Sequence, residues 1–384
     1  MLNNLKSYLE KVHVTPISWL VGISGILMVR FFLEAFSSKT SGGFFASDAS
    51  TLVHYYLFFL SMVVVFMVFI REILPGWKHI APQLAVFSFL LVFIAPVVDW
   101  IISGGEGLRM AYLFDAPREI LISFLTFFGK DLSVGITWGI RAEVALALLS
   151  LGFVVYFAEK SFKKAIASVV SLYILIFIFL SLPGIMNIIG GAHVAGNYFN
   201  QPLLFIQKSI SDSVTTLNNI HSSLDYSSVV RMLEISFNFM MGKILFLILA
   251  AAAFIWFRLN FKEKLRAVIK NSRPERGAHY ILMIALGLFS AYLIFPALKL
   301  NWNDWLSVLM LCLSFYFSWM FAVCVNDIAD EDIDAVSNAS RPLIVKTLDK
   351  EEQQDIIHRQ IALLEKGFYL GKKLYSRRDD LYVR

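Results

Sequence analysis

The feature that most constrains this chain is a series of apolar blocks, each about 20 residues long, separated by short polar joints. A helix of about 20 apolar residues crosses roughly 30 Å of hydrocarbon, whereas the strands of a barrel would give shorter, alternating runs. With 58% hydrophobic and only 16% charged residues, the composition also lies outside that of soluble domains. We therefore expect an all-α, polytopic helical membrane protein.

About eight of the blocks are long enough to be transmembrane helices. They run from Ile17 to Phe36, Leu52 to Ile70, Ile80 to Ile102, Val134 to Ala158, Ala165 to Ile189, Phe239 to Phe257, Ala278 to Leu298 and Trp305 to Val325. Lys and Arg side chains are concentrated in alternate joints, which predicts that these joints and both termini are cytoplasmic. We expect a multi-pass protein of the cell membrane, and we interpret the net charge of +5 as a topology signal rather than a sign of a nucleic-acid partner.

The polar joints divide the chain into four segments. Residues 1–257 form a six-span membrane domain of unknown function, with a long external segment at 190–238. A basic cytoplasmic linker follows at 258–276, then two spans and their polar continuation at 277–349, and a polar cytoplasmic tail at 350–384. The apolar stretch from Ile120 to Gly129 is too short to span, so we expect it to be a re-entrant or interfacial helix.

Several charged residues lie inside the predicted spans. Arg30 and Glu34 are four residues apart on one helix face and can neutralise each other. Arg141 and Glu143 point to different faces, and Asp99 at an outer helix end is a candidate partner for Arg141. Ionisable groups inside a membrane are expensive to bury, so each is either part of a structural salt bridge or functional.

An acidic stretch from Asn326 to Asp334 begins where the eighth block ends, with five carboxylates in nine residues. If the helix continues, Asn326, Asp330 and Asp334 share one face, with Asp327 adjacent. Carboxylates one turn apart repel each other, and more strongly at a boundary of low dielectric, so a cation is expected. Mg²⁺ prefers oxygen ligands and commonly bridges carboxylates to substrate phosphates. We therefore predict Asn326, Asp330 and Asp334 as metal ligands.

Basic residues follow this acidic stretch. Arg341 comes seven residues after Asp334, and Lys346 lies just beyond it. An Arg fork close to a carboxylate-bound metal is the combination that a diphosphate leaving group requires. We predict that Asn326, Arg341 and Lys346 bind such a substrate.

These residues resemble the UbiA superfamily of membrane prenyltransferases. Its first aspartate motif, Asn-Asp-x-x-Asp-x-x-x-Asp, is matched by Asn326, Asp327, Asp330 and Asp334, and its following Arg-Pro-Leu is matched by residues 341–343. Ser272-Arg273-Pro274 also looks like the entry to the first family helix. The last two spans thus resemble the first two helices of a UbiA-type bundle.

The resemblance implies a Mg²⁺-dependent transfer of a polyprenyl group from its diphosphate to an acceptor of unknown identity, within membrane lipid. It implies that Asp327, Asp330 and Asp334 are catalytic. It covers only about residues 264–349, however, and neither the later family spans nor a second acidic motif follows. Either the chain is truncated, which we favour, or a partner chain supplies the missing half, or the motif persists without catalysis.

Two other functions remain open from the sequence. The first is a non-catalytic membrane transporter or scaffold in which the acidic cluster binds a partner or a cation. The second is a transferase that uses another diphosphate donor, such as a lipid-linked sugar or a phosphoribosyl donor, because the metal and the Arg recognise the diphosphate and not the group attached to it.

Overall fold

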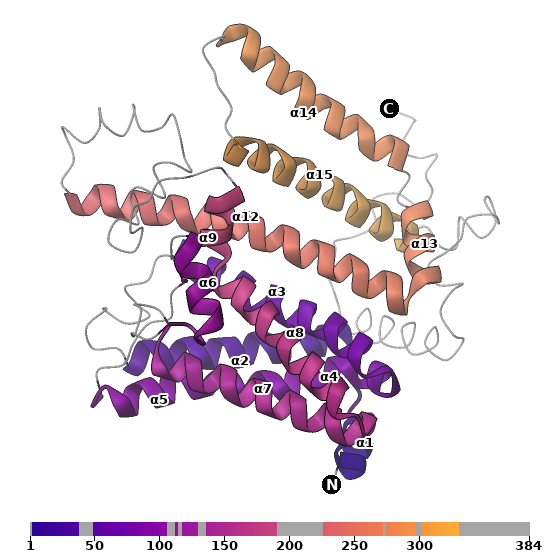
Figure 1. The fold of residues 1–384 in the computed structure, drawn as a ribbon. Coiled ribbons are helices and arrows are strands. Elements are labelled where there is room, and N and C mark those ends of the chain that lie inside the picture. The colour runs from indigo at the N-terminus through magenta and orange to yellow at the C-terminus, as the bar shows by residue number, and fades with distance from the viewer. Residues whose placement is uncertain are drawn as a thin grey trace, which may run out of the picture. The chain divides into compact units, whose positions relative to one another are not determined.

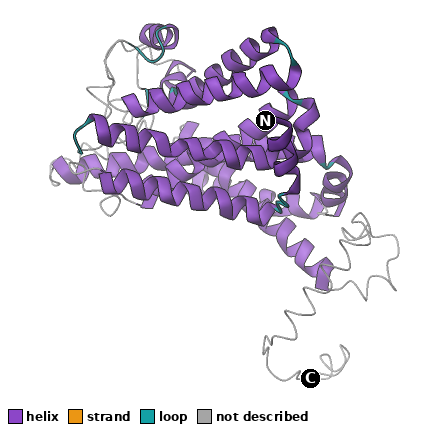
Figure 2. Cartoon of the chain, turned by 90° about the horizontal axis from the view of Figure 1, so that it is seen from below, coloured by secondary structure: helices purple, strands orange, loops and turns teal. Residues whose placement is uncertain are grey.

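The structure is a computed structural model. It describes residues 2–37, 49–105, 112–113, 117–129, 136–189, 226–271, 274–295 and 302–329. These residues form helices and connecting loops without a strand (Figures 1 and 2), which confirms the predicted all-α fold class. The first helices are α1 (Leu2–Lys11), α2 (Pro16–Ser37), α3 (Ala49–Ile73), η2 (Pro75–Ile80), α4 (Ala81–Phe89), η3 (Leu90–Phe93), α5 (Ile94–Ile102) and α6 (Pro117–Leu125). They are followed by α7 (Trp138–Glu159), α8 (Phe162–Leu180), α9 (Leu182–Ile189), α12 (Tyr226–Asn260), α13 (Lys262–Asn271), α14 (Pro274–Ile294) and α15 (Trp302–Ala329).

Eight stretches within the described residues are long and apolar enough to cross a membrane. They are Pro16–Ala35, Ala49–Ile73, Pro75–Ile102, Trp138–Glu159, Phe162–Leu180, Ile235–Asn260, Gly277–Ile294 and Asn303–Asn326. Each overlaps one of the eight predicted blocks. The protein is therefore a multi-pass helical membrane protein.

The third of these spans is not one continuous α-helix. It passes through η2, α4, η3 and α5, and its sequence contains Pro75, Pro82 and Pro96. A proline has no N–H to donate and its ring clashes with the preceding turn, so each one interrupts the regular hydrogen-bond ladder. The resulting irregular backbone contributes directly to the polar network described below.

The chain divides into two compact units. Unit 1 comprises Met1–Asn260 and Ala291–Leu311, and unit 2 comprises Phe261–Ser290 and Cys312–Arg384. We predicted a six-span domain, a linker, a partial transferase domain and a tail. Those segments were defined partly by function, which compact units do not test, so that division stays a prediction.

Within unit 1, α3 and α12 form the most extensive helix pair. Near one end, Asn238 of α12 meets His54 of α3, and near the other end Arg71 donates to the Asn260 side chain at 3.0 Å. Residue numbers therefore increase in the same direction along both helices. Two parallel spans have an odd number of spans between them. The described residues provide three, Pro75–Ile102, α7 and α8, which agrees with α6 not being a span of its own.

Also in unit 1, α7 and α8 form a tight helical hairpin (Figure 1). Lys160 ends α7 in a left-handed conformation with φ of 52°, and its N–H donates to the Tyr156 carbonyl. Ser161 then begins α8 by accepting from the Lys164 N–H. A left-handed cap followed directly by an N-cap residue explains how two long helices reverse direction over two residues.

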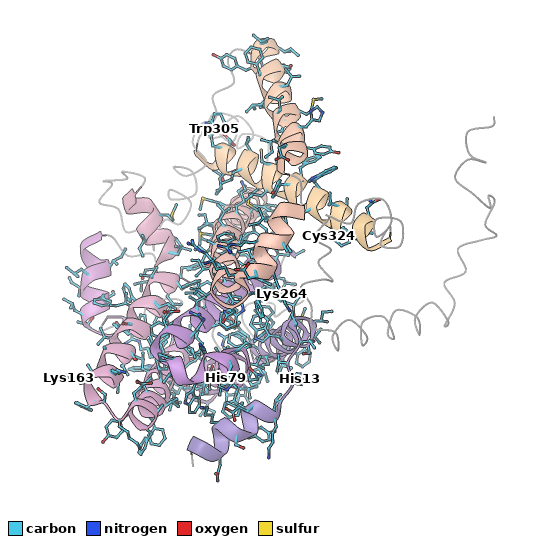
Figure 3. The ribbon with its side chains drawn as sticks, turned by 90° about the vertical axis from the view of Figure 1, so that its right-hand side faces the viewer. His13, His79, Lys163, Lys264, Trp305 and Cys324 are labelled. Atoms are coloured by element: carbon cyan, nitrogen blue, oxygen red, sulfur yellow. The ribbon has the colours of Figure 1, made fainter. Side chains whose placement is uncertain are left out.

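In unit 2, α14 and α15 approach each other closely at Gly277. A Cβ added there would lie 2.9 Å from the Tyr316 ring and 3.3 Å from Trp319. One turn along α14, the rings of Tyr280 and Trp319 are 5.4 Å apart. Trp305 and Cys324 lie toward opposite ends of α15 (Figure 3). Only 6% of the most apolar stretch of each helix is buried, so most of their apolar side chains are left for lipid or for further helices to cover.

Candidate functional site

The predicted acidic site begins in the last turn of α15. The spanning stretch ends at Asn326, and the helix continues to Ala329. Asn326 is exposed there, and Asp327 follows it in the same helical turn. Asp330, Asp334, Arg341 and Lys346 lie outside the described residues. The structure therefore places the first two motif positions at the end of a span and does not describe the other four.

Within the described part of the chain, no group of three or more His, Cys, Asp or Glu side chains is arranged to hold a metal ion. The motif carboxylates that follow Ala329 do not belong to that part. The predicted Mg²⁺ site is therefore neither supported nor contradicted by the described residues.

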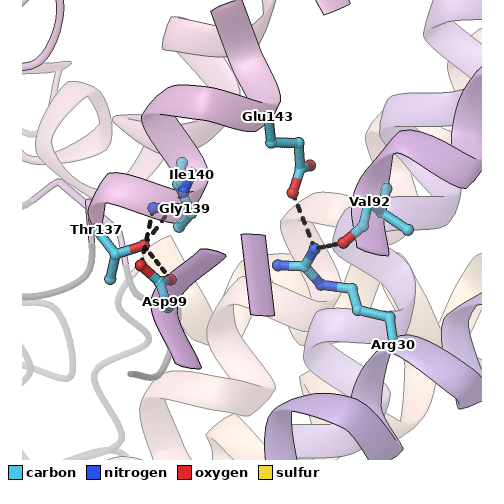
Figure 4. A network of polar contacts seen from close by, with 7 residues as sticks. All are labelled: Arg30, Val92, Asp99, Thr137, Gly139, Ile140 and Glu143. Carbon is cyan, nitrogen blue, oxygen red and sulfur yellow. Dashed lines mark hydrogen bonds and ion pairs between the residues drawn. The ribbon is translucent and has the colours of Figure 1, made fainter. Parts of the chain in front are cut away.

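A second polar site lies among the helices of unit 1 (Figure 4). Its charged residues were noted in the sequence, but their partners were not predicted. Nη1 of Arg30, from α2, donates to Oε2 of Glu143 on α7 at 3.1 Å and also to the carbonyl of Val92 in η3. Its guanidinium lies 4.7 Å from the centroid of the Phe59 ring. Arg30 is only 1% exposed, so these contacts replace the water that a charged side chain needs. The ion-pair partner that the structure gives Arg30 thus lies 113 residues away in the sequence, and the predicted pairing with Glu34 stays a prediction.

The contact of Arg30 with Val92 follows from a proline. In a regular helix the Val92 carbonyl would accept from the N–H four residues later, but that residue is Pro96. A buried carbonyl without a donor is costly, and the Arg30 guanidinium supplies one. This Pro, four residues after Val92 in an apolar block, was the signal in the sequence that could have pointed to a buried donor.

Asp99, at the end of α5, caps the start of α7. Its Oδ1 accepts from the Gly139 N–H at 2.8 Å and its Oδ2 accepts from the Thr137 hydroxyl at 2.5 Å. Thr137 in turn accepts from the Ile140 N–H at 3.2 Å. A carboxylate is stabilised at a helix N-terminus, where N–H groups are unpaired and the dipole is positive. The suggested pairing of Asp99 with Arg141 was therefore wrong.

Arg141 instead stabilises the turn after α6. It donates to the carbonyls of Gly129 at 3.0 Å and Phe128 at 3.1 Å. Phe127, Phe128 and Gly129 all have positive φ, of 53°, 73° and 90°. A positive φ is strained for the two phenylalanines, so the Arg141 guanidinium stabilises a turn that would otherwise be unfavourable.

Between the helices of unit 1 lies a cavity of about 450 Å³. Residues of α2, α3, α4, η3, α5, α7 and α8 line it, and nearly all of them are aliphatic or aromatic. Among the described residues that line it, the charged side chains are Arg30 and Glu143, the pair described above. A cavity of this size, mostly apolar with a few convergent polar groups, has the character of a small-molecule site.

A further buried network joins α3, α12 and the segment at 112–113. His54 Nδ1 lies 2.8 Å from Asn238 Oδ1, and its Nε2 lies 2.6 Å from the Tyr112 hydroxyl. The Asn238 amide nitrogen donates to Thr51 at 2.9 Å, which leaves Oδ1 as an acceptor. His54 therefore donates from Nδ1 and accepts from Tyr112 at Nε2. Burial raises the pKa of the Tyr112 phenol well above that of an exposed tyrosine, so the phenol remains the donor.

Comparisons with known proteins add no further assignment, because no family model, no curated protein and no solved structure matches the chain.

Proposed function

We propose that the chain binds the diphosphate of a polyprenyl lipid together with Mg²⁺ at the cytoplasmic end of α15, as part of a UbiA-type polyprenyl transferase of the cell membrane. The observation that carries this proposal is the position of Asn326 and Asp327 in the last turn of a span-length helix. A ligand that is apolar at one end and highly charged at the other needs its charged end held at such a boundary. Both termini and the basic joints are assigned to the cytoplasm.

In this proposal Asn326, Asp330 and Asp334 hold Mg²⁺, and Arg341 and Lys346 hold phosphate oxygens. An exposed amide followed by carboxylates at helical spacing is an all-oxygen donor set, which is the chemistry that Mg²⁺ selects. The metal supplies positive charge to the departing diphosphate. The carboxylates of Asp330 and Asp334 would hold the metal in position, and Asp327 would add a further carboxylate from the adjacent helix face.

The acceptor is unknown, and further helices are required to enclose an ionised allylic chain away from water. The apolar surfaces of α14 and α15, of which so little is buried, are where such helices would pack, from a partner chain or from a longer form of this one. Asp99 and Arg141 both bind elements within unit 1, which does not favour an ion path through them.

The test is binding of radiolabelled geranylgeranyl diphosphate to the full chain in lipid nanodiscs, with Mg²⁺ and with a chelator. We expect Mg²⁺-dependent binding that Asp330→Asn weakens at least roughly tenfold, because the substitution removes one charged ligand. The matched control is Asp355→Asn, the same change in the polar tail outside the motif.

Competitors distinguish the other functions. If phosphoribosyl diphosphate displaces the labelled lipid better than inorganic diphosphate does, the donor would be a phosphoribosyl diphosphate and not a polyprenyl diphosphate. If binding needs no Mg²⁺, or if Asp330→Asn and Asp355→Asn bind the lipid with equal affinity, the transferase proposal would be wrong. Either result would support a transporter or scaffold.

A further inference from the structure

We propose that the cavity in unit 1 binds a single-chain lipid whose head is a neutral hydroxyl group, such as a long-chain alcohol, with the hydroxyl at Arg30 and Glu143. None of the lining residues belongs to the acidic end of α15, so this proposal is independent of the proposed function. It concerns Arg30 and Glu143, for which the sequence left a structural and a functional role open.

The length of the cavity matches an extended hydrocarbon chain. On α7 its lining runs from Ile140 to Val154, which are 14 residues apart and therefore about 21 Å along the helix axis. On α3 it runs from Phe58 to Ile70, over a similar distance. A space that is long, apolar and more than half as deep as the roughly 30 Å hydrocarbon core fits one chain better than a compact molecule.

The polar groups lie toward one end of this space. Glu143 is on the second turn of α7, close to Ile140 and far from Val154. Arg30 reaches it from α2, and Val92, which also lines the cavity, accepts from the same guanidinium. The lining toward Ile70 and Val154 is apolar except for Ser150. A ligand in this cavity therefore has one polar end and one apolar end.

Charge determines the chemistry of that polar end. The pair is formally neutral, so an ionised head group would lose its hydration without an excess countercharge to replace it. Glu34, one turn beyond Arg30, adds a further negative charge that opposes an anion. A hydroxyl can donate to the Glu143 carboxylate and accept from the Arg30 guanidinium at once. Glu143 retains 16% side-chain exposure, which leaves room for such a contact.

The experiment uses the full chain in phosphatidylcholine nanodiscs and a hexadecanol that carries a diazirine in its chain. After irradiation, peptide mass spectrometry locates the attachment sites, which we expect on cavity residues such as Met62, Phe66 and Ile176. Unlabelled hexadecanol should compete at least roughly tenfold better than hexadecanoate or hexadecylammonium, whose chains are the same. Attachment spread over the exposed faces of the helices, or equal competition by the three heads, would overturn the proposal.

Filling the cavity provides a matched pair of variants. Ala147 lines it, and Ala145, two residues away on α7, does not. Ala147→Phe should abolish labelling of cavity residues and Ala145→Phe should not. Ser150→Phe, at an exposed lining position on the same helix, serves if Ala147→Phe does not fold. Labelling that survives both filling variants would contradict the assignment.

A last variant tests the head group itself. Glu143→Gln keeps the size of the side chain and, among the described lining residues, leaves Arg30 as the charged one. The preference should then shift from hexadecanol toward hexadecanoate. A purely structural ion pair would leave the ranking of the three competitors unchanged, and that result would remove the head-group assignment.

Discussion

Gly139 is a residue whose replacement tests the packing of α5 against α7. A Cβ added there would lie 2.2 Å from the Ala95 carbonyl oxygen and 2.7 Å from the Asp99 carboxylate. The Ala95 oxygen belongs to the backbone and the Asp99 carboxylate is held by two hydrogen bonds, so moving either one is energetically costly. We expect Gly139→Ala to cost about 3 kcal/mol of stability, as overpacking does. The thermal unfolding midpoint of the detergent-purified chain measures this loss.

The control for this change is Gly25→Ala on α2, where an added Cβ meets nothing within 4 Å. There the substitution should be neutral or stabilising by up to about 1 kcal/mol, because Ala favours a helix. Equal losses from the two substitutions would mean that α5 and α7 are not packed as described.

Tyr112 provides a second prediction, in which pH has a definite sign. Tyr112→Phe leaves the buried Nε2 of His54 without its donor and should cost about 1–3 kcal/mol at neutral pH. Because burial raises the pKa of Tyr112, the unfolded state loses this proton first, near pH 10. The contribution of Tyr112 to the stability of the wild type should therefore be constant below about pH 10 and fall above it, by about 1.4 kcal/mol per pH unit.

Unfolding midpoints of the wild type, Tyr112→Phe and Tyr156→Phe between neutral and alkaline pH measure this effect. Tyr156 is 44% exposed on α7, so its substitution should leave the stability at neutral pH nearly unchanged. If Tyr112→Phe keeps the wild-type slope, Tyr112 is not buried in the protonated form.

The partners of single charged residues were the least predictable feature of the sequence. Four-residue spacing correctly places Arg30 and Glu34 on one face, but Glu143 comes to Arg30 only because α2, η3 and α7 pack together. Periodicity specifies which residues share a face and not which helices meet. The same limit explains why Asp99 was suggested for Arg141 when it caps a helix N-terminus.

At the scale of helices, length and apolar content were sufficient to predict all eight spans, and local chemistry explains most differences at their ends. The fifth span was expected to continue to Ile189 but α8 ends at Leu180, three residues before Pro183, and α9 follows separately. The fourth was expected from Val134 but begins at Trp138, after the Thr137 cap. The seventh ends at Ile294, because Phe295 precedes Pro296 and is disfavoured in a helix.

The caps of α7 and α8 allow a prediction about helix ends. Thr137 is 4% exposed and takes part in two hydrogen bonds, with Asp99 and Ile140. Ser161 caps α8 through one long bond of 3.4 Å, at a more open position. Thr137→Ala should therefore cost about 2 kcal/mol and Ser161→Ala about 0.5 kcal/mol, near the two ends of the range for N-caps. Unfolding midpoints compare them, and the reverse order would contradict the role given to Asp99.

For the whole molecule, the decisive property is the number of crossings. The parallel direction of α3 and α12 requires an even number of crossings between the start of one and the start of the other, which the spans α3, α4–α5, α7 and α8 provide without α6. If each of the eight span-length helices of the described residues crosses once, the chain returns to the side from which it started. We therefore predict that the acidic stretch after α15 and the N-terminus lie on the same side of the membrane.

Single cysteines test this topology directly. Cys312 and Cys324 could also react with the label, so both are first replaced by Ala. Ser7→Cys, Ser223→Cys and Ser376→Cys are then labelled one at a time with a membrane-impermeant maleimide, in intact cells and in inverted vesicles. We expect label at positions 7 and 376 only in inverted vesicles, and at position 223 only in intact cells.

Each other outcome has a specific meaning for the molecule. Labels at positions 7 and 376 on opposite sides would require an odd number of crossings, so α6 or another segment would have to span. Both termini outside the cell would keep eight crossings but place the carboxylates after Asn326 away from the cytoplasm, where the proposed donor could not be supplied from within the cell. That second result would not affect the proposal for the cavity of unit 1. The cavity depends on how the helices of unit 1 pack against each other and not on which side of the membrane their ends lie.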